Sequence, residues 1–196
     1  MPASIAVMIS GTGTLLQSLI DDPHRSYDIA VVVADRDASG LRRAQAAGIP
    51  TVVMPPGDFS DRAAWSRALA DEIAAFGPDW VVSAGFMRLL DPAFLERFPQ
   101  RVINSHPALL PAFPGAHAVA DAIEYGVKVT GCTVHLVDSG VDTGPIIAQE
   151  PVVVDARDDA SSLHERIKMV EWRLLPEVVN RLVARGCTVN GRRVEL

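Results

Sequence analysis

The 196-residue chain has 24 acidic and 18 basic side chains, a net charge of −6, and 48% hydrophobic but only 6% aromatic residues. The negative charge argues against a nucleic-acid surface, and no stretch approaches the ~18 apolar residues of a membrane span. We therefore expect neither a nucleic acid nor a membrane as a partner. Cys132 and Cys187 have no metal spacing and the first residues lack a secretory signal pattern, so we expect a cytoplasmic enzyme with reduced thiols. One domain, residues 1–196, is expected from the length.

The chain begins with a predicted strand, a glycine turn and a helix. Residues 5–9 are a continuous apolar run, Ser10-Gly11-Thr12-Gly13-Thr14 follows, and leucines then recur at helical spacing from Leu15. Glycines allow a close backbone approach, and the free amides of a helix N-terminus favour an anion. The third glycine of a dinucleotide-binding motif is missing. The turn therefore predicts either a site for one phosphate or a tight turn without a ligand.

Strands and helices alternate through the next part of the chain. Strands are predicted at 29–34, 52–54 and 80–84, and helices at 41–47 and 61–76. This alternation implies right-handed crossovers and a largely parallel sheet. Ligands of such sheets lie beyond the carboxyl ends of the strands, so the loop 85–90 should share a rim with the glycine turn. Its Met87, Leu89 and Leu90 either wall a slot for a flat ring or are ordinary packing that leads into a helix at 92–98.

A polar pair follows the next apolar run, at Asn104 and His106. If the strand ends here, alternation places both side chains on the same side of the backbone. The prolines at 107, 111 and 114 then make the exit from the strand stiff and non-helical. The segment predicts either a preorganised polar site or a strand-to-loop connection with a solvated Asn and His.

The second half changes pattern after a helix predicted at 117–125. Strands at 127–137 and 146–154 are joined by residues 138–145, which are too few for a helical crossover, so this pair should be antiparallel. Glycines and a proline restrict that connection. Its Asp142 is therefore either a carboxylate held at a defined place or a turn aspartate that caps its own backbone.

The last long helix is predicted at 162–183, with Ser162 to Glu165 as a capping box. Glu171 falls inside the apolar stripe of this helix, where a carboxylate is costly unless it contacts a ligand or forms a salt bridge. Pro176 should kink the helix because it removes one backbone hydrogen bond. Residues 186–196 look like an irregular or hairpin-like end.

Four motifs resemble the folate-dependent formyltransferase family, in particular its glycinamide ribonucleotide transformylase branch. They occur in the order Ser10-Gly11-Thr12-Gly13, Ala84-Gly85-Phe86-Met87-Arg88, Asn104-Ser105-His106-Pro107-Ala108-Leu109-Leu110-Pro111 and Asp142-Thr143-Gly144-Pro145. The resemblance implies formyl transfer from 10-formyltetrahydrofolate to the amine of 5-phosphoribosylglycinamide in purine biosynthesis. The expected fold is α/β, a Rossmann-like three-layer αβα sandwich with a mostly parallel sheet and an antiparallel strand pair toward the C-terminal part.

The resemblance also implies roles for individual residues. No metal is implied, the partners are the two small-molecule substrates, and a homodimer is left open. Many members of the family have Asn where this chain has Leu15, which removes a side-chain contact to the substrate phosphate. The implied catalytic residues are Asn104, His106 and Asp142; the ribonucleotide contacts are Gly11, Thr12, Gly13, Thr14, Leu15 and Glu171; and the folate contacts are Arg62, Met87, Arg88, Leu89, Leu90 and Asn104.

Two other function classes compete with transfer. A hydrolase that releases formate from formyltetrahydrofolate could use the same trio, with water in place of the amine, and would not need the phosphate turn or Glu171. A non-catalytic nucleotide-binding module would explain the glycine turn, but it leaves Asn104, His106 and Asp142 without a role.

Overall fold

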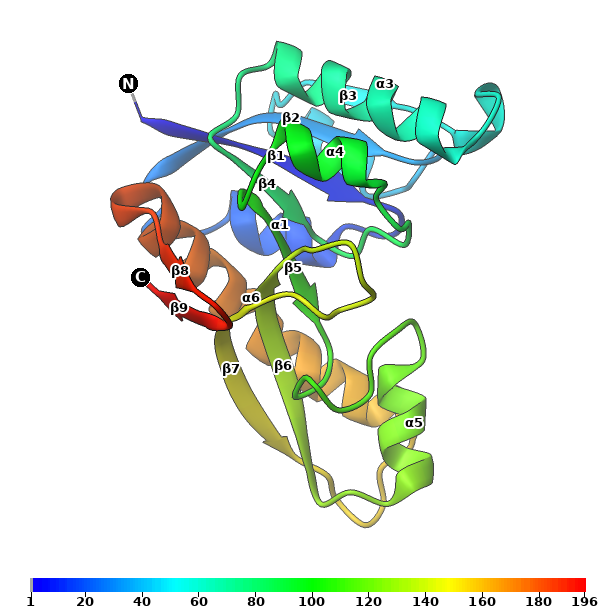
Figure 1. Ribbon diagram of the computed structural model, residues 1–196. Coiled ribbons are helices and arrows are strands. Elements are labelled where there is room, and N and C mark those ends of the chain that lie inside the picture. Colours follow the sequence, from blue (N-terminus) through cyan, green and yellow to red (C-terminus); the bar gives the residue numbers. More distant parts are fainter. Residues whose placement is uncertain (1) are drawn as a thin grey trace.

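A single nine-stranded sheet organises the computed structural model, which describes residues 2–196 (Figure 1). The strand order is β3-β2-β1-β4-β5-β6-β7-β9-β8, and the first five strands are parallel. β6 runs antiparallel to both β5 and β7, which confirms the predicted antiparallel pair. The strands are β1 Ala3–Ile9, β2 Tyr27–Ala34, β3 Thr51–Val53, β4 Trp80–Ser83, β5 Val102–His106, β6 Val129–Leu136, β7 Ile146–Val153, β8 Thr188–Asn190 and β9 Arg193–Glu195.

Helices cover both faces of this sheet and complete the expected three-layer sandwich (Figure 1). The core on one face includes side chains of α1, α2 and α6, and the core on the other includes those of α3 and α4. The continuous apolar run of β1 is buried because both of its faces are covered. The helices are α1 Thr14–Ile20, α2 Leu41–Ala46, α3 Arg62–Ala75, α4 Pro92–Arg97, α5 Ala118–Tyr125 and α6 Ala160–Arg185, with a short 3₁₀ helix η1 at Pro56–Asp58.

The start of α6 differs from the prediction. The helix begins at Ala160, and Asp159 is its N-cap, with the Asp159 side chain accepting from the backbone N–H of Ser162 and the Ser162 hydroxyl accepting from that of Asp159. The predicted capping box of Ser162 and Glu165 is wrong because the helix begins earlier, and Ser162 exchanges these hydrogen bonds with Asp159 instead of with Glu165. Pro176 lies inside α6 without ending it.

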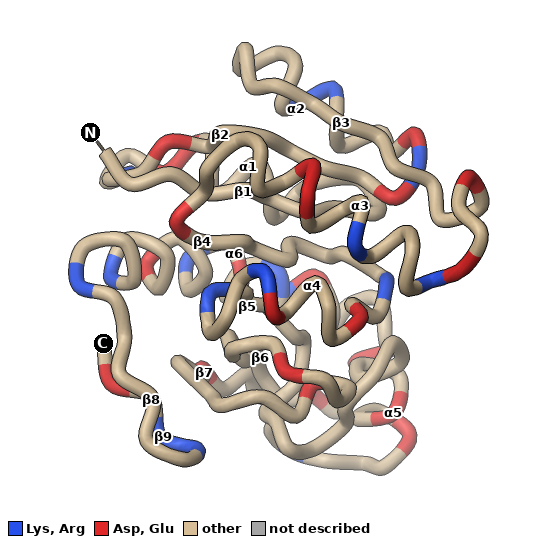
Figure 2. Tube along the Cα trace, turned by 45° about the horizontal axis from the view of Figure 1, so that its top comes forward, with Lys and Arg blue, Asp and Glu red and all other residues tan. Residues whose placement is uncertain are grey.

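The predicted hairpin-like end is confirmed by the antiparallel pair β8 and β9, whose β9 joins the edge of β7. Acidic and basic residues are interspersed along the trace, while α5 carries only acidic ones (Figure 2). Within residues 2–196, no helix is long and apolar enough to cross a membrane.

The chain order of the strands locates the site. From β1 the chain moves outward to β2 and β3, and it then returns to the other side of β1 to form β4 and β5. The loops at the carboxyl ends of β1, β4 and β5 therefore meet where the strand order reverses, which is where open α/β sheets bind ligands.

Candidate active site

The glycine turn after β1 is tied to the loop after β4. The backbone N–H of Ser10 donates to the Gly85 carbonyl at 3.2 Å, and the Ser10 hydroxyl accepts from the Met87 N–H at 2.9 Å. Gly13 is left-handed, with φ of 68°, and a Cβ there would lie 2.9 Å from the Cα of Gly40. Backbone packing against Gly40 thus explains Gly13 without a ligand. Gly11 has open space around its Cα.

A cavity of about 400 Å³ opens beside this turn. Its wall contains residues 11–15 of the turn, Ser105 and Pro107 beside the polar pair, residues 116–120 at the start of α5, and one side of α6. Leu15 is 9% exposed and contributes both to this wall and to the core. The cavity brings the predicted ribonucleotide residues Gly11, Thr12, Gly13, Thr14, Leu15 and Glu171 together.

The polar pair lies at the carboxyl end of β5, as expected. Asn104 is directly opposite His135 on β6, and His106 is opposite Thr133. The side-chain amide nitrogen of Asn104 lies 3.3 Å from Nε2 of His135 and donates to Oδ1 of Asp142 at 3.5 Å. His106 is 4% exposed. The trio is therefore assembled, but behind the wall of the cavity, where only Ser105 and Pro107 of this segment are exposed to it.

The structure resolves the two readings of Asp142. The residue that caps the turn is Asp138, which accepts from the Gly140 N–H at 3.0 Å and from the Thr143 hydroxyl at 2.6 Å. Asp142 has a left-handed backbone, with φ of 54°, which aspartate tolerates better than most residues. Its Oδ2 accepts from the Gly115 N–H at 2.8 Å and lies 3.3 Å from Nδ1 of His106. Asp142 thus joins three segments of the chain.

The pKa values of Asp142 and His106 are shifted by their surroundings. Burial alone would raise the pKa of Asp142, but the interaction with His135, the Gly115 N–H and the charge of His106 together lower it to about 2. Burial lowers the pKa of His106, and the Asp142 carboxylate and the Phe113 carbonyl oppose this effect. Asp142 is therefore ionised at neutral pH and is the main group that favours a charged His106.

The proline-rich exit holds His106 from its other side. Nε2 of His106 lies 2.8 Å from the carbonyl oxygen of Phe113. Phe113 has a left-handed backbone, with φ of 53°, and its ring packs edge-on against Tyr125 of α5, with 5.8 Å between ring centroids. Both nitrogens of the imidazole thus face oxygen acceptors of the protein.

The predicted folate residues lie mainly outside this cavity. Met87 is in its wall, and Met87 and Leu89 are 66% and 53% exposed, so these two side chains are not core packing. The guanidinium of Arg88 donates from Nε to Asp35 at 2.6 Å, which anchors the loop to the end of β2. Leu90 packs partly buried beside the core under α3 and α4. Arg62 lies 3.9 Å from Asp91, at the start of α4.

Glu171 is buried at 7% exposure and lines the cavity. Its Oε1 accepts from the Ser105 hydroxyl at 2.7 Å. Burial raises the pKa of Glu171, although Ser105 and Lys168 oppose this. No salt bridge to Glu171 exists among residues 2–196, so the structural salt-bridge reading of this residue is wrong.

Sequence reasoning missed several side chains of the site. His135 contacts both Asn104 and Asp142, and it could have been found from the strand register, which sets it opposite Asn104. His164 and Lys168 of α6 line the cavity together with Glu171. Their spacing of four and three residues places them on one helix face, a polar face that the apolar stripe of the helix does not indicate. His117, which precedes α5, also lines the cavity.

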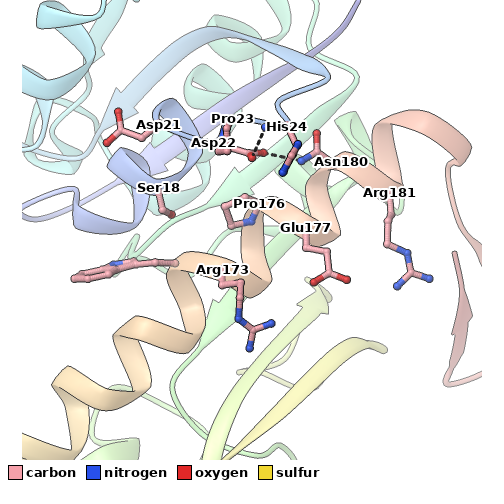
Figure 3. Close-up of a pocket in the computed structure, with 11 residues that line it drawn as sticks. Ser18, Asp21, Asp22, Pro23, His24, Arg173, Pro176, Glu177, Asn180 and Arg181 are labelled. Carbon is pink, nitrogen blue, oxygen red and sulfur yellow. Dashed lines mark hydrogen bonds between the residues drawn. The ribbon is translucent and has the colours of Figure 1, made fainter.

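A second cavity, of about 630 Å³, lies between α6 and the loop after α1 (Figure 3). In it the Asn180 side chain donates to Asp22 at 2.6 Å, and Arg173 pairs with Glu150. Trp172 borders both cavities. The larger cavity contains none of the predicted site residues, all of which the structure describes. Size alone therefore does not identify the active site.

Comparisons with known proteins identify the family of the chain. The family model described as "Formyl transferase" matches residues 3–179. The chain is 53% identical to a phosphoribosylglycinamide formyltransferase of Mycobacterium tuberculosis (strain H37Rv), over 97% of this chain and 90% of that protein, and 36% identical to the protein of that name from Bacillus subtilis, over 91% and 93%. Its fold is similar to glycinamide ribonucleotide transformylase 1 from Symbiobacterium toebii, with a TM-score of 0.97, 44% identity, and coverage of 100% and 94%. The chain therefore belongs to the formyl transferase family.

Proposed function

We propose that this protein transfers the formyl group of 10-formyltetrahydrofolate to the amine of 5-phosphoribosylglycinamide, a step of purine biosynthesis. The observation that supports this most is the adjacency of two different sites. Ser105 and Pro107 form part of the wall of a cavity that suits a phosphorylated ligand, and Asn104 and His106 are their neighbours on β5. The names of the relatives fit a reaction that needs both sites.

The cavity fits a ribonucleotide in its distribution of groups. One end has the backbone amides of the turn at Gly11 to Thr14, to which we assign the phosphate. Lys168 of α6 is in the same wall, and its only ion pair among the described residues is with the exposed Glu165, at 2.6 Å, so its ammonium can turn to an anion. Glu171 offers an acceptor for ribose hydroxyls. Leu15 contributes only an apolar wall there.

The chemistry follows from where charge develops. The amine attacks the formyl carbon and produces a tetrahedral intermediate with an oxyanion. The Asn104 amide and His106 are the donors assigned to that oxyanion, and one such donor is worth roughly 10²–10³ in rate. The amine must lose a proton and N10 of the folate must gain one, and His106 is positioned by Asp142 to carry it, directly or through water.

Both donors are engaged with the protein before substrate arrives. The Asn104 amide nitrogen faces His135 and Asp142, and Nε2 of His106 faces the Phe113 carbonyl. The two contacts of Asn104, at 3.3 and 3.5 Å, are long, so little free energy is lost when a contact to substrate replaces them. The contact from His106 to Phe113 is shorter, so the exit segment that carries Phe113 must shift when His106 turns to the substrate.

The folate is assigned to the rim formed by residues 85–90. The exposed side chains of Met87 and Leu89 supply apolar surface for the flat pterin, and Arg88 holds the loop by its contact with the buried Asp35. Arg62 is retained as a folate contact on the family resemblance alone. 10-Formyltetrahydrofolate is thus a co-substrate that leaves as tetrahydrofolate, and no metal has a step in this mechanism.

One assay tests the proposal against its competitors. The purified protein is incubated with 10-formyltetrahydrofolate, with and without 5-phosphoribosylglycinamide, and the folate product is followed. Turnover that requires the amine supports transfer, since the hydrolase needs only water. Equal turnover without the amine indicates hydrolysis, and no turnover in either mixture indicates a binding module. An Asn104→Ala variant in the same assay controls for contaminating activity.

A further inference from the structure

Ser105 occupies an unusual place in the site, between the two residues of the polar pair but on the opposite side of β5. Strand alternation points Asn104 and His106 one way and Ser105 the other. The face that Ser105 reaches is the one covered by α6, because its hydroxyl contacts Glu171 of that helix. The strand that presents the reacting groups on one side thus contacts the substrate-binding helix on the other.

The contact between Ser105 and Glu171 is short and buried. The Ser105 hydroxyl donates to Oε1 at 2.7 Å, and the two residues are both 7% exposed. It is the only hydrogen bond that the carboxylate makes with residues 2–196. No buried side-chain oxygen or nitrogen in that range lacks a partner, so Oε2, which has none, must reach the open space of the cavity that Glu171 lines.

The Ser105 oxygen has a second side-chain neighbour besides Glu171. Cys132 of β6 lies with Sγ 3.5 Å from the Ser105 oxygen. Burial raises the pKa of the Cys132 thiol to about 12, so the thiol stays protonated and can donate to the Ser105 oxygen. Because the Ser105 hydroxyl donates its one proton to Glu171 at 2.7 Å, the longer contact with Cys132 is secondary, and its loss should leave the bond to Glu171 in place.

We propose that Ser105 is a positioning residue for the ribonucleotide, whose hydroxyl holds the Glu171 carboxylate ionised and aimed into the cavity. The free oxygen of that carboxylate then accepts hydrogen bonds from neighbouring hydroxyls of a sugar. A carboxylate with this burial is costly to ionise alone, and a hydroxyl donor stabilises the charged form selectively. The inference rests on the proposed function, because the ligand it assigns to Glu171 is the ribose of that substrate.

The test compares Ser105→Ala with two matched variants. Ser105→Thr keeps a hydroxyl, and Cys132→Ala removes the other partner of Ser105 without touching the bond to Glu171. For each we would measure kcat, the KM for 5-phosphoribosylglycinamide, the KM for 10-formyltetrahydrofolate and the Tm, between pH 5.5 and 9. We expect Ser105→Ala to raise the ribonucleotide KM about 10-fold or more, the usual scale for a hydrogen bond to a charged group. Its kcat and its folate KM should stay within about twofold.

The pH profile separates positioning from simple loss of packing. Without the donor the pKa of Glu171 rises further, so the ribonucleotide KM of Ser105→Ala should begin to worsen at a higher pH during acidification than it does in the parent. Ser105→Thr should restore both the KM and the profile, whereas Cys132→Ala should change the Tm alone.

Two results would overturn the inference: a ribonucleotide KM of Ser105→Ala within twofold of the parent, or an increase in Cys132→Ala as large as that in Ser105→Ala. Neither would touch the proposed function, which fails separately if the parent shows no amine-dependent transfer. Should Ser105→Ala fail to fold, the comparison of parent, Ser105→Thr and Cys132→Ala decides the case. An unshifted KM profile in Ser105→Thr, together with a shifted one in Cys132→Ala, would then contradict it.

Discussion

Asp142 lies in the connection between β6 and β7, His106 is the last residue of β5, and their facing atoms, Oδ2 and Nδ1, are 3.3 Å apart. The same Oδ2 accepts from the Gly115 N–H at 2.8 Å, so the carboxylate is fixed in place and does not depend on the histidine for its position. The Asp138 side chain and Gly144 shape the connection behind it, since a side chain at Gly144 would collide with the Leu136 carbonyl. The loop therefore presents a preorganised anion to the imidazole.

Replacement of this carboxylate should affect turnover and leave folding intact. Asp142→Asn keeps the shape but removes the charge that favours an imidazolium at His106, so we expect kcat to fall about 10²-fold or more. The pKa assigned to His106 in the pH–rate profile should move to lower pH. Steady-state kinetics across pH with circular dichroism at 25 °C would check both. Near-normal formyl transfer by this variant would contradict the proposed pairing of Asp142 with His106.

The stability of the parent should also reflect Asp142. Its pKa of about 2 lies below the ordinary 3.8, so its stabilising contribution is complete above about pH 4 and is lost as the pH falls toward 2. The Tm of Asp142→Asn should lack this part of the acid dependence while matching the parent's trend near neutral pH. The difference in Tm between the two proteins should shrink as the pH falls toward 2, so a difference that stays constant from pH 7 to pH 2 would contradict the assigned shift.

His135 should support Asn104 and not act on substrate itself. It is 2% exposed, its Nδ1 lies 2.9 Å from the Leu136 carbonyl, and Nε2 faces the Asn104 amide. His135→Leu would leave that amide with only its 3.5 Å contact to Asp142, and we expect kcat to fall about 10-fold with little change in either KM. A double variant with Asn104→Ala should be no slower than Asn104→Ala alone, because residues that act as a unit are not additive. Additive losses would indicate an independent role for His135.

The parts of the fold that rest on local pattern were predictable. The buried run of β1, the helix at α3 with its stop after Phe76, and the short connection that forces β6 and β7 antiparallel all follow from neighbouring residues. The start of α6 was misplaced because Ser162 and Asp159 both have the chemistry of a cap, and only the backbone decides between them. Asp159 is the N-cap because, from its position, its side chain accepts from the Ser162 N–H while the Ser162 hydroxyl accepts from the Asp159 N–H.

The composition of the site was harder to predict because it depends on which strands become neighbours. Asn104, His106 and Asp142 could be named from motifs, but His135 joins them only through the register of β5 against β6. The bond between Ser105 and Glu171 connects residues from a strand and a distant helix, and no periodicity in either segment reveals it. The engagement of His106 by Phe113 likewise needs the path of the proline-rich exit.

Leu15 offers a test of the phosphate turn. The family resemblance places Leu15 where many members have Asn, and its side chain is shared between the core and the cavity wall. Leu15→Asn should add a donor for the phosphate and lower the ribonucleotide KM up to about 10-fold, as expected for a hydrogen bond to a charged group. It should also lower stability by about 2 kcal/mol through lost apolar packing. Leu15→Ala is the matched control: it should lose a similar amount of stability, and its ribonucleotide KM should not fall.

The buried carboxylate of Glu171 should cost stability at the pH where it serves binding. Its pKa is raised mainly by burial, so the native state holds a proton that the unfolded chain has already lost above the ordinary value of 4.5. The contribution of Glu171 to stability therefore falls as the pH rises from about 4.5 through the raised pKa. Glu171→Gln keeps an acceptor for the Ser105 hydroxyl but removes this titration.

We expect Glu171→Gln to have a higher Tm than the parent at pH 7.5, and the difference should shrink as the pH approaches 4.5. The same change should raise the ribonucleotide KM, because a neutral amide is a weaker acceptor for ribose hydroxyls than a carboxylate, while kcat stays near the parent value. Thermal unfolding at several pH values and kinetics on one preparation would test both halves. A lower Tm at pH 7.5 with an unchanged KM would mean that the charge stabilises the fold and has no role in binding.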